Sequence, residues 1–347
     1  MPGRSVKKHA LFAAAEGLAP ERKRLLRLGR PDIATWVVVT AFVFLLPAAL
    51  GDRYYLNAMN FIALYSMVAI GLCLLTGYGG QLSMSHAAFF AIGAYGSSIL
   101  CLRAGLQPVL AIFLSQIFSA LVAWGIGWIV LRLKGHYLAI ATLSFTVIIE
   151  HLLKNWVKLT GGLQGLSAIP PITIGGFAIN TDWRFYFLVW LTVMLLQLFA
   201  LNLADSRMGR VFKAIKEGED VARVFGADVK KYKIKLFILS SVYASLAGSF
   251  YAHYVTFVSP SVGSVMFAIE IVLVLAFGGY TMLWGAMLGV ASINLLNEYL
   301  TAFAEYKQLI YGLALIIIMV FFPNGLLQGI KDYGTGVLRL SRRERET

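Results

Sequence analysis

One carboxylic acid stands in the middle of a long apolar run, and its position needs a chemical explanation more than that of any other residue. Glu270 lies within the run Val262–Phe277, where most of the neighbouring residues are aliphatic or aromatic. An ionisable group at such a place is costly and normally faces the interior of a helix bundle, where a partner compensates its charge. Two roles therefore remain open for Glu270: lining a pathway, or forming a buried structural pair.

The other groups that could act as acids, nucleophiles or metal ligands form no catalytic or metal-binding pattern. His86, His136 and His253 fall near the ends of apolar runs, and no second histidine stands four residues after any of them. We therefore predict no metal ligand among them. Glu150 and His151 lie near the end of another run, where both can reach an interface. The sequence has no nucleophile–base pair and no G-x-x-x-x-G-K-[ST] phosphate loop, so we expect no enzyme, no cofactor and no ATP site of that kind.

A cluster of small and polar residues between two apolar runs is a second candidate for a functional role. It comprises Gly79, Gly80, Gln81, Ser83 and Ser85. Glycine and serine at this spacing could leave backbone groups free to line a cavity, as interrupted helices do in membrane transporters. Residues of this size also let two helices approach closely, which is a packing role. The sequence leaves both roles open.

The composition of the chain indicates that these residues are positioned by elements lying in a membrane. Of the 347 residues, 59% are hydrophobic and only 14% are charged, and the mean hydropathy is +0.75. A soluble domain could not bury that much apolar surface, so we predict an all-α polytopic membrane protein. The net charge of +13 is distributed in a way that indicates orientation in a bilayer rather than a nucleic-acid partner. Cys73 and Cys101 lie in apolar runs and give no disulfide framework.

Ten apolar runs are long enough to be interpreted as membrane spans, six before the charged segment Asp205–Lys235 and four after it. The first starts only at Ile33 and is long enough to remain as a span, so the basic residues before it are not predicted to be a cleaved signal peptide. Two runs are short and rich in small residues, His86–Leu102 and Val262–Phe277, and we expect them to be tilted, broken or re-entrant. The ten runs are Ile33–Leu50, Leu56–Leu75, His86–Leu102, Val109–Leu131, Tyr137–Leu153, Phe185–Leu203, Leu236–Val258, Val262–Phe277, Met282–Phe303 and Gln308–Phe322.

Lysine and arginine are distributed unequally between the two sides of this arrangement. One side carries 24 of the 30 lysine and arginine residues and the other carries six. The positive-inside rule assigns the richer side, and with it both termini, to the cytoplasm. The chain then divides into a basic cytoplasmic arm (1–32), a transmembrane domain (33–325) and a basic cytoplasmic tail (326–347).

The segment Asp205–Lys235 is the only long, densely charged stretch between two blocks of apolar runs. Its apolar residues recur at helical spacing on either side of Gly218, as Val211, Phe212 and Ile215 and then as Val221, Ala222 and Phe225. Asp205 or Ser206 can cap the first helix, and Gly226 can end the second. We predict two short amphipathic helices at the membrane surface; the alternative is a solvated loop that binds lipid headgroups.

The longest predicted outer loop, 154–182, contains several glycines and the pair Pro170-Pro171. It could pack as a lid or offer a docking surface. The alternative is a connector rich in turns.

Several motifs recur in the order typical of one known family. The run GYGGQLSMSHAAFFAIGAYGSSIL, from Gly77 to Leu100, resembles a signature of the LivM-type permeases of branched-chain amino-acid transport. These permeases are membrane subunits of ABC importers that use a separate binding protein. The resemblance extends from about Leu56 to Gly325. It also includes LKGHYLAIATLSF, LTGGLQGLSAIP, GRVFKAIKEGEDVARVFGADVKKYK, ASLAGSFYAH and IEIVLVLAFGG.

The resemblance implies a specific role for the charged segment. In such importers, the cytoplasmic loop with a core like E-A-A-x-x-x-G forms coupling helices that dock into a groove on the ATPase. The core here runs from Asp220 to Gly226, with aspartate for glutamate and valine for alanine. We therefore expect Ala222 and Phe225 to insert into that groove. The full set of expected coupling residues is Arg210, Ala214, Ile215, Asp220, Val221, Ala222, Phe225 and Gly226.

The resemblance also implies the assembly. It predicts a multi-pass protein of the bacterial inner membrane, surrounded by membrane lipid, which pairs with a second permease subunit, two ATP-binding subunits and a periplasmic binding protein. Urea or short amides are alternative substrates carried by similar permeases. A stand-alone secondary transporter or channel is the alternative class, and it would need paired intramembrane ionisable groups. Only Glu270 is central here, which counts against that class.

Overall fold

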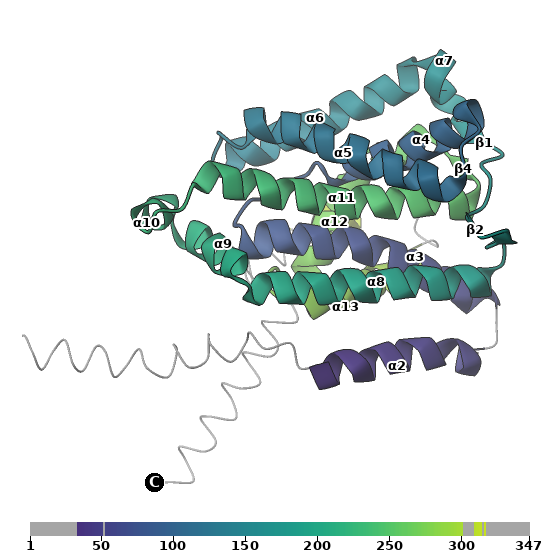
Figure 1. Ribbon diagram of the computed structural model, residues 1–347, viewed down its shortest axis with the longest axis horizontal. Helices are drawn as coiled ribbons and strands as arrows, with labels where there is room; N and C mark the ends of the chain where they lie inside the picture. The colour runs from purple at the N-terminus through teal and green to yellow at the C-terminus, as the bar shows by residue number, and fades with distance from the viewer. Residues whose placement is uncertain (1–32, 51–52, 301–308, 314–315, 317–347) are drawn as a thin grey trace, which may run out of the picture.

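The computed structural model describes residues 33–50, 53–300, 309–313 and 316, and this part of the chain is almost entirely helical (Figure 1). The longer helices are α2 (Ile33–Leu50), α3 (Arg53–Leu72), α4 (His86–Ala104), α5 (Pro108–Val130), α6 (His136–Asn155), α8 (Asp182–Asp205), α11 (Val229–Val255), α12 (Val265–Gly278) and α13 (Leu283–Leu300). The shorter ones are α7 (Val157–Thr160), α9 (Arg207–Glu217), α10 (Glu219–Val224), the π-helical turn η1 (Cys73–Tyr78) and the 3₁₀ turns η2 (Gly162–Gln164) and η3 (Pro260–Gly263).

Six helices in the described residues are long and apolar enough to cross a membrane: α3 with η1, α4, α5, α6, α8 and α11. A further pair, α12 and α13, is bent by 119° at a short break. Helix α2 contributes a shorter apolar stretch, Trp36–Pro47. The protein is therefore a helical, multi-pass membrane protein, and each of the first nine predicted runs overlaps one of these helices.

Two of the predicted runs were expected to be irregular. The structure shows that one forms a regular helix and that the other begins irregularly. The run His86–Leu102 was expected to be tilted, broken or re-entrant; α4 is one uninterrupted helix of 19 residues, so the expected break is wrong, while the tilt stays a prediction. The run Val262–Phe277 does contain an irregular start, because the 3₁₀ turn at Pro260–Gly263 precedes α12. The tenth run, Gln308–Phe322, lies largely outside the described residues, as do the arm and the tail.

Helices α3, α4 and α11 form the centre of the bundle, and small residues bring α4 and α11 into backbone contact. A methyl group at Gly93 would lie 1.9 Å from the carbonyl oxygen of Ser245, and one at Gly248 would lie 1.9 Å from that of Phe90. Ser249 also donates to the Gly93 carbonyl at 3.0 Å. This is the close, small-residue contact by which membrane helices associate without a hydrophobic driving force between them.

Large apolar side chains also cover the outer surface of the bundle. On α5, Phe113, Phe118, Leu121 and Trp124 are each more than half exposed. Contiguous apolar surface of this kind is unfavourable in water and suits lipid or another membrane subunit. The outer face of α5 is thus apolar, as expected for a helix in a bilayer, while its buried face consists mainly of small residues and includes Ser115 and Ser119.

The two ends of the bundle differ in character (Figure 1). We call the end formed by α9, α10 and the first turn of α11 the charged end. The opposite, hairpin end carries α7 and four short strands. Strand β1 (Leu166–Ser167) pairs antiparallel with β4 (Phe257–Val258), and β2 (Thr173–Ile174) pairs antiparallel with β3 (Phe177–Ala178).

The loop 154–182 is fastened to the bundle at the hairpin end. Beyond the β1–β4 pairing, Ile169 donates its backbone N–H to the Thr256 carbonyl at 3.2 Å. The His253 Nδ1 atom lies 2.7 Å from the Pro170 carbonyl oxygen, and Arg103 of α4 donates to the Lys158 carbonyl. The loop therefore packs on α4 and α11 as an ordered cap.

Candidate functional site

The charged segment folds as two helices, α9 and α10, joined at Gly218. Ser206 caps α9, since its hydroxyl accepts a hydrogen bond from the Gly209 N–H at 3.2 Å. Gly226, at φ +78°, follows the end of α10 in the left-handed region that glycine favours. Asp228 then caps α11 through the Lys231 N–H at 3.2 Å. The two amphipathic helices predicted from the spacing are therefore present.

The apolar residues of the segment divide into an inner and an outer set. Ile215 and Ala222 are buried against Val229 at the start of α11, and Ala214 lies against the same small cluster. Ala222, only 1% exposed, is thus inside the segment. The expectation that its side chain enters a partner's groove is corrected by this placement, because a side chain packed against Val229 cannot also contact another protein.

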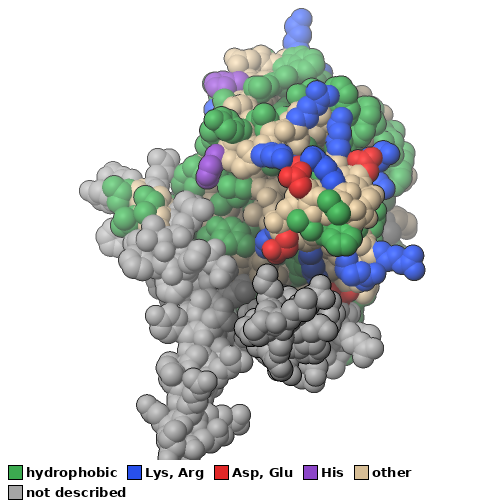
Figure 2. Space-filling model, turned by 90° about the vertical axis from the view of Figure 1, so that its left-hand side faces the viewer, with side chains coloured by type: hydrophobic (Ala, Val, Ile, Leu, Met, Phe, Trp, Pro, Cys, Tyr) green, Lys and Arg blue, Asp and Glu red, His purple; other side chains and the backbone are tan. Residues whose placement is uncertain are grey.

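The outer set forms an exposed apolar patch at the tip of the charged end. Val221 is 52% exposed, Val224 85% and Phe225 82%. We call these three residues the apolar tip. Figure 2 views this end and shows hydrophobic side chains with Lys and Arg side chains gathered around them and a few acidic ones between. Arg210 and Asp220 are also exposed, and the Asp220 carboxylate pairs with Arg223 at 3.0 Å.

A cluster of ion pairs centred on Glu219 holds α10 to the bundle. The Glu219 carboxylate lies 2.9 Å from Lys233 Nζ of α11 and 3.5 Å from Lys134 Nζ in the α5–α6 connection. Arg223 approaches the same carboxylate at 3.4 Å. Lys233, whose side chain is only 7% exposed, also donates to the Leu131 carbonyl at the end of α5, at 3.3 Å. Arg223 stands four positions after Glu219 on the same helix, whereas Lys233 and Lys134 lie too far away in the chain to be recognised by spacing.

The electrostatics of this cluster favour the ionised carboxylate. Partial burial of Glu219 favours the neutral acid, but the hydrogen bonds and positive charges of Lys233 and Lys134 outweigh that effect. The pKa of Glu219 is therefore held below its ordinary value.

The glycine-rich turn at the end of α3 is the place where α9 contacts the bundle. Lys216 of α9 donates to the Gly77 carbonyl at 2.8 Å. Gly80 has φ +64°, and a methyl group there would lie 3.2 Å from the Lys216 Cα atom. A methyl group at Gly79 would lie 2.4 Å from a methyl carbon of Leu236 on α11. These glycines therefore let three elements meet, and the geometry favours packing over an open cavity.

The remaining residues of this motif are buried. Gln81, Ser83 and Ser85 are at most 3% exposed, and the two serine hydroxyls lie 2.9 Å apart. The intervening Met84 is fastened to α6, because its N–H donates to Thr142 at 3.0 Å and its carbonyl accepts from Thr146 at 2.9 Å. The loop is an ordered connection between α3, α4 and α6.

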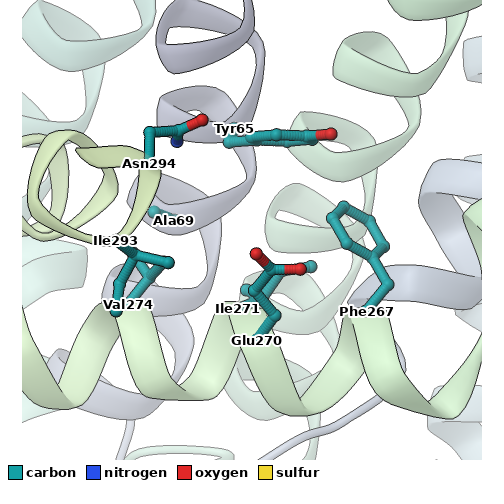
Figure 3. Close-up of a pocket in the computed structure, with 8 residues that line it drawn as sticks. All are labelled: Tyr65, Ala69, Phe267, Glu270, Ile271, Val274, Ile293 and Asn294. Carbon is teal, nitrogen blue, oxygen red and sulfur yellow. The ribbon is translucent and has the colours of Figure 1, made fainter. Parts of the chain in front are cut away.

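Glu270 lies beside a small hollow between α3, α12 and α13 (Figure 3). Its carboxylate points into the space between these helices and accepts a hydrogen bond from the Asn297 amide of α13 at 2.6 Å. Asn297 in turn accepts a hydrogen bond from Tyr311. Within the described residues, Glu270 forms no ion pair. The hollow is lined by Tyr65, Ala69, Phe267, Glu270, Ile271, Val274, Ile293 and Asn294.

His86 and His253 are engaged in structural contacts. The His86 Nε2 atom lies 2.5 Å from the Ser240 hydroxyl of α11, which donates to the Gly71 carbonyl of α3 at 2.7 Å. His86 thus ties α4 to two neighbouring helices. Across the described ranges, no three His, Cys, Asp or Glu side chains are grouped in a way that could hold a metal ion.

Comparison with known proteins finds relatives of the kind that the sequence motifs resemble. Residues 54–319 match the family described as "Branched-chain amino acid transport system / permease component". The chain is 29% identical over 340 residues to the high-affinity branched-chain amino acid transport system permease protein LivM of Salmonella typhimurium, covering 91% of this chain and 77% of that protein. It is 28% identical, over the same shares, to LivM of Escherichia coli.

A second type of relative covers somewhat less of the chain. The permease protein LivH of Salmonella typhimurium, from the same kind of transport system, is 22% identical over 290 residues, which cover 78% of this chain and 93% of that protein. No solved structure matches the chain. The family match spans well over half of the sequence, including the glycine-rich turn, the charged segment and Glu270. The chain therefore belongs to the family of permease components of branched-chain amino acid transport systems.

Proposed function

We propose that this chain is one of two permease subunits of an ABC importer for branched-chain amino acids in a bacterial inner membrane. The match of residues 54–319 to the permease family carries this proposal. The relatives include both LivM and LivH permease proteins, which supports pairing with a second, related permease. Since the sequence has no phosphate loop, ATP is hydrolysed by two separate subunits, and a periplasmic binding protein delivers the substrate.

The proposed topology has ten spans, with both termini in the cytoplasm. Helices α2, α3, α4, α5, α6, α8 and α11 alternate in direction between the two ends of the bundle. Helix α12 continues this alternation: its first residue, Val265, donates to Glu150 near the end of α6 at 3.4 Å, and its last turn leads to Tyr280 beside Gly77. Helix α13 then returns, and the run Gln308–Phe322 supplies the tenth crossing.

The charged end is the proposed docking site for an ATPase subunit. The apolar tip, Val221, Val224 and Phe225, presents apolar side chains that water solvates poorly, within a ring of charge. Such a small exposed apolar patch with a polar rim is typical of a protein–protein contact. The inner residues Ile215 and Ala222 pack against Val229 in the small core of the segment.

Glu270 is the proposed pathway residue. Its partner within the described part of the chain is the neutral amide of Asn297, and it faces a hollow rather than a cation. Within the described residues no counter-charge lies beside this carboxylate, and an intramembrane ionisable group is by default a candidate functional site. The hollow beside it is lined in part by the apolar side chains of Ile271, Val274 and Ile293.

Reconstitution of the purified components in liposomes tests the function. We expect uptake of labelled leucine when the second permease, the ATP-binding subunits, ATP and a loaded binding protein are all present, and none when any one is omitted. Gradient-driven uptake by the isolated chain, abolished by an uncoupler but not by removal of ATP, would instead identify a secondary transporter. Uptake of urea or a short amide in place of leucine would retain the importer and change its substrate.

A further inference from the structure

The contact between α9 and the glycine-rich turn continues beyond α3 to the helix pair that carries Glu270. A methyl group at Gly77 would lie 1.8 Å from the carbonyl oxygen of Tyr280, in the turn between α12 and α13. The Cys73 thiol also donates to that carbonyl at 3.2 Å. The backbone of η1 therefore lies directly against the α12–α13 turn, with no side chain of Gly77 between them.

Lys216 reaches the same backbone from the other side. Its ammonium donates to the Gly77 carbonyl at 2.8 Å, and its own backbone lies against Gly80. Lys213, one turn earlier on α9, lies over the Tyr78 ring at 5.4 Å. A charge-assisted hydrogen bond to a backbone carbonyl is among the stronger contacts available to a lysine, and glycine at this turn lets the two backbones touch.

We propose that Lys216 and the Gly77–Gly80 turn transmit movement of the coupling helices to the α12–α13 pair, and so to the hollow beside Glu270. This inference rests on the proposed function, and it assigns Lys216 as a positioning residue that contacts neither ATP nor the amino acid. The path has three steps, from Lys216 to the Gly77 carbonyl, from Gly77 to the Tyr280 backbone, and from Tyr280 along α12 to Glu270. Each step is a backbone contact without a flexible side chain in between, apart from the lysine.

The Glu219 cluster gives the segment a second, separate attachment. It fastens α10 to α11 and to the end of α5 rather than to α3 and α12. If α10 is held there, movement imposed on the segment reaches the α12–α13 pair through α9 and Lys216. The Glu219 cluster thus holds the segment to α5 and α11, whereas Lys216 contacts the turn after α3, which lies against the α12–α13 turn.

Two variants test this transmission in the complete reconstituted importer. Lys216→Met keeps the length of the side chain and removes the donor. We expect the complex to assemble as in the wild type, while leucine uptake and the stimulation of ATP hydrolysis by a loaded binding protein fall at least fivefold. Lys216→Arg, which retains a donor, should recover part of both activities. Lys235→Met is the matched control, because it removes the same charge from the segment but lies beyond the proposed docking site, where its exposed ammonium lies over the Tyr232 ring at 5.8 Å.

A reversible cross-link gives the decisive measurement even if Lys216→Met weakens assembly. The Cβ position of Gly80 lies 3.3 Å from the Lys216 Cβ atom, which is close to the separation that a disulfide requires. In the double variant Gly80→Cys, Lys216→Cys, the reduced protein lacks the lysine contact, and uptake should fall at least fivefold. Oxidation replaces that contact by a covalent bond and should restore uptake to within about twofold of the wild type. The single variants control for strain at Gly80 and for oxidation of other thiols.

The outcomes separate this inference from the proposed function. If the wild-type importer takes up no leucine with all components present, the proposed function fails. If the wild type transports and Lys216→Met matches it within twofold, the transmission proposal alone is overturned. It is also overturned if oxidation of the double variant leaves uptake low, since a rigid link between α9 and the turn would then not support coupling.

Discussion

At the scale of single residues, the position of Glu270 combines a carboxylate, a neutral amide partner and an apolar hollow. The Asn297 amide stabilises the carboxylate by one hydrogen bond of 2.6 Å, but it brings no positive charge. A structural ion pair would have a cation at this position. A passing amino acid carries one, on its ammonium group. This is the physical reason for preferring the pathway role.

Substitution of Glu270 separates the two roles that the sequence left open. Glu270→Gln preserves the shape and can still accept from Asn297, so we expect a melting temperature within about 2 °C of the wild type and an uptake reduced at least tenfold, equivalent to about 1.4 kcal/mol. Thermal unfolding in detergent and leucine uptake in proteoliposomes measure the two quantities. Glu150→Gln, which loses its pair with Lys154 at the hairpin end, is the control for removal of a carboxylate. A large loss of stability in Glu270→Gln, with uptake falling only in proportion to folded protein, would favour the structural role.

At the scale of elements, α9 and α10 form a unit with its own small core and a distinct outer surface. Ile215, Ala222 and Val229 close the core, while the apolar tip faces outward. The unit is attached to the bundle by polar contacts through Glu219 and Lys216, and Phe212 of α9 is buried in the main core. The segment is therefore held to the helices on several sides.

Removal of an aromatic ring from the apolar tip is predicted to weaken binding of the ATPase subunit. Phe225 is 82% exposed, so Phe225→Ser should leave the stability of the chain nearly unchanged. If the ring is buried in a partner, its loss should weaken that contact by about 2 kcal/mol or more, roughly thirtyfold in affinity. Co-purification of the ATPase with the tagged permease measures this. Phe177→Ser, the same change at a residue 76% exposed at the hairpin end, should leave co-purification intact. Equal retention of the ATPase by both variants would contradict the docking site.

The Glu219 cluster is predicted to stabilise the segment against local unfolding. Glu219→Gln leaves the nearly buried Lys233 without its counter-charge, which should lower the free energy of opening of α10 by roughly 3 kcal/mol, the lower end of the range for a broken buried pair. Amide hydrogen exchange of α9 and α10 would then be faster by about two orders of magnitude. Glu217→Gln is the control, because Glu217 is exposed and forms no ion pair within the described part of the chain.

The same cluster gives the segment a defined pH dependence. The pKa of Glu219 is lower in the folded state than in the unfolded state, so its contribution to stability is present above the unfolded value of about 4.3 and is lost as the pH falls through the lower, folded value. Protection of the α10 amides, corrected for the intrinsic exchange rate, should be constant from about pH 7 to pH 5 and should decline below about pH 4. In Glu219→Gln, this decline should be absent.

At the scale of the whole molecule, the charged end and the hairpin end are proposed to face opposite sides of the membrane. The segment 205–235 and the α5–α6 connection beside it carry 11 of the 16 described lysine and arginine residues, and the hairpin end carries an ordered cap of strands and α7. Under the positive-inside rule, the ATPase approaches one end and the binding protein the other. The central helices α3, α4 and α11 connect these two surfaces.

Labelling of single introduced cysteines in intact cells tests this orientation. Asn180 at the hairpin end and Lys231 at the charged end are both exposed, while the native Cys73 and Cys101 are buried. A membrane-impermeant maleimide should modify Asn180→Cys in cells with a permeabilised outer membrane, and it should modify Lys231→Cys only after the inner membrane is opened. The reverse pattern would invert the proposed topology.

The sequence by itself determined the class of the protein, the number and order of its apolar runs up to α13, the two helices of the charged segment and the family. These properties follow from composition, from periodicity and from motifs that are contiguous in the chain. The sequence also identified Glu270 as unusual, because an acid within an apolar run is visible without a structure.

Only the tertiary structure decided which apolar face of the charged segment packs inward and what holds the segment in place. Ala222 and Phe225 lie three positions apart and satisfy the same helical pattern, yet one is buried against Val229 and the other is exposed. Apart from Arg223 on the same helix, the partners of Glu219 and Lys216 lie on other elements, between 14 and 139 positions away in the chain. Periodicity records that a helix has an apolar side, but contacts between distant residues depend on how the helices pack, and that packing is fixed by the glycines that let their backbones meet.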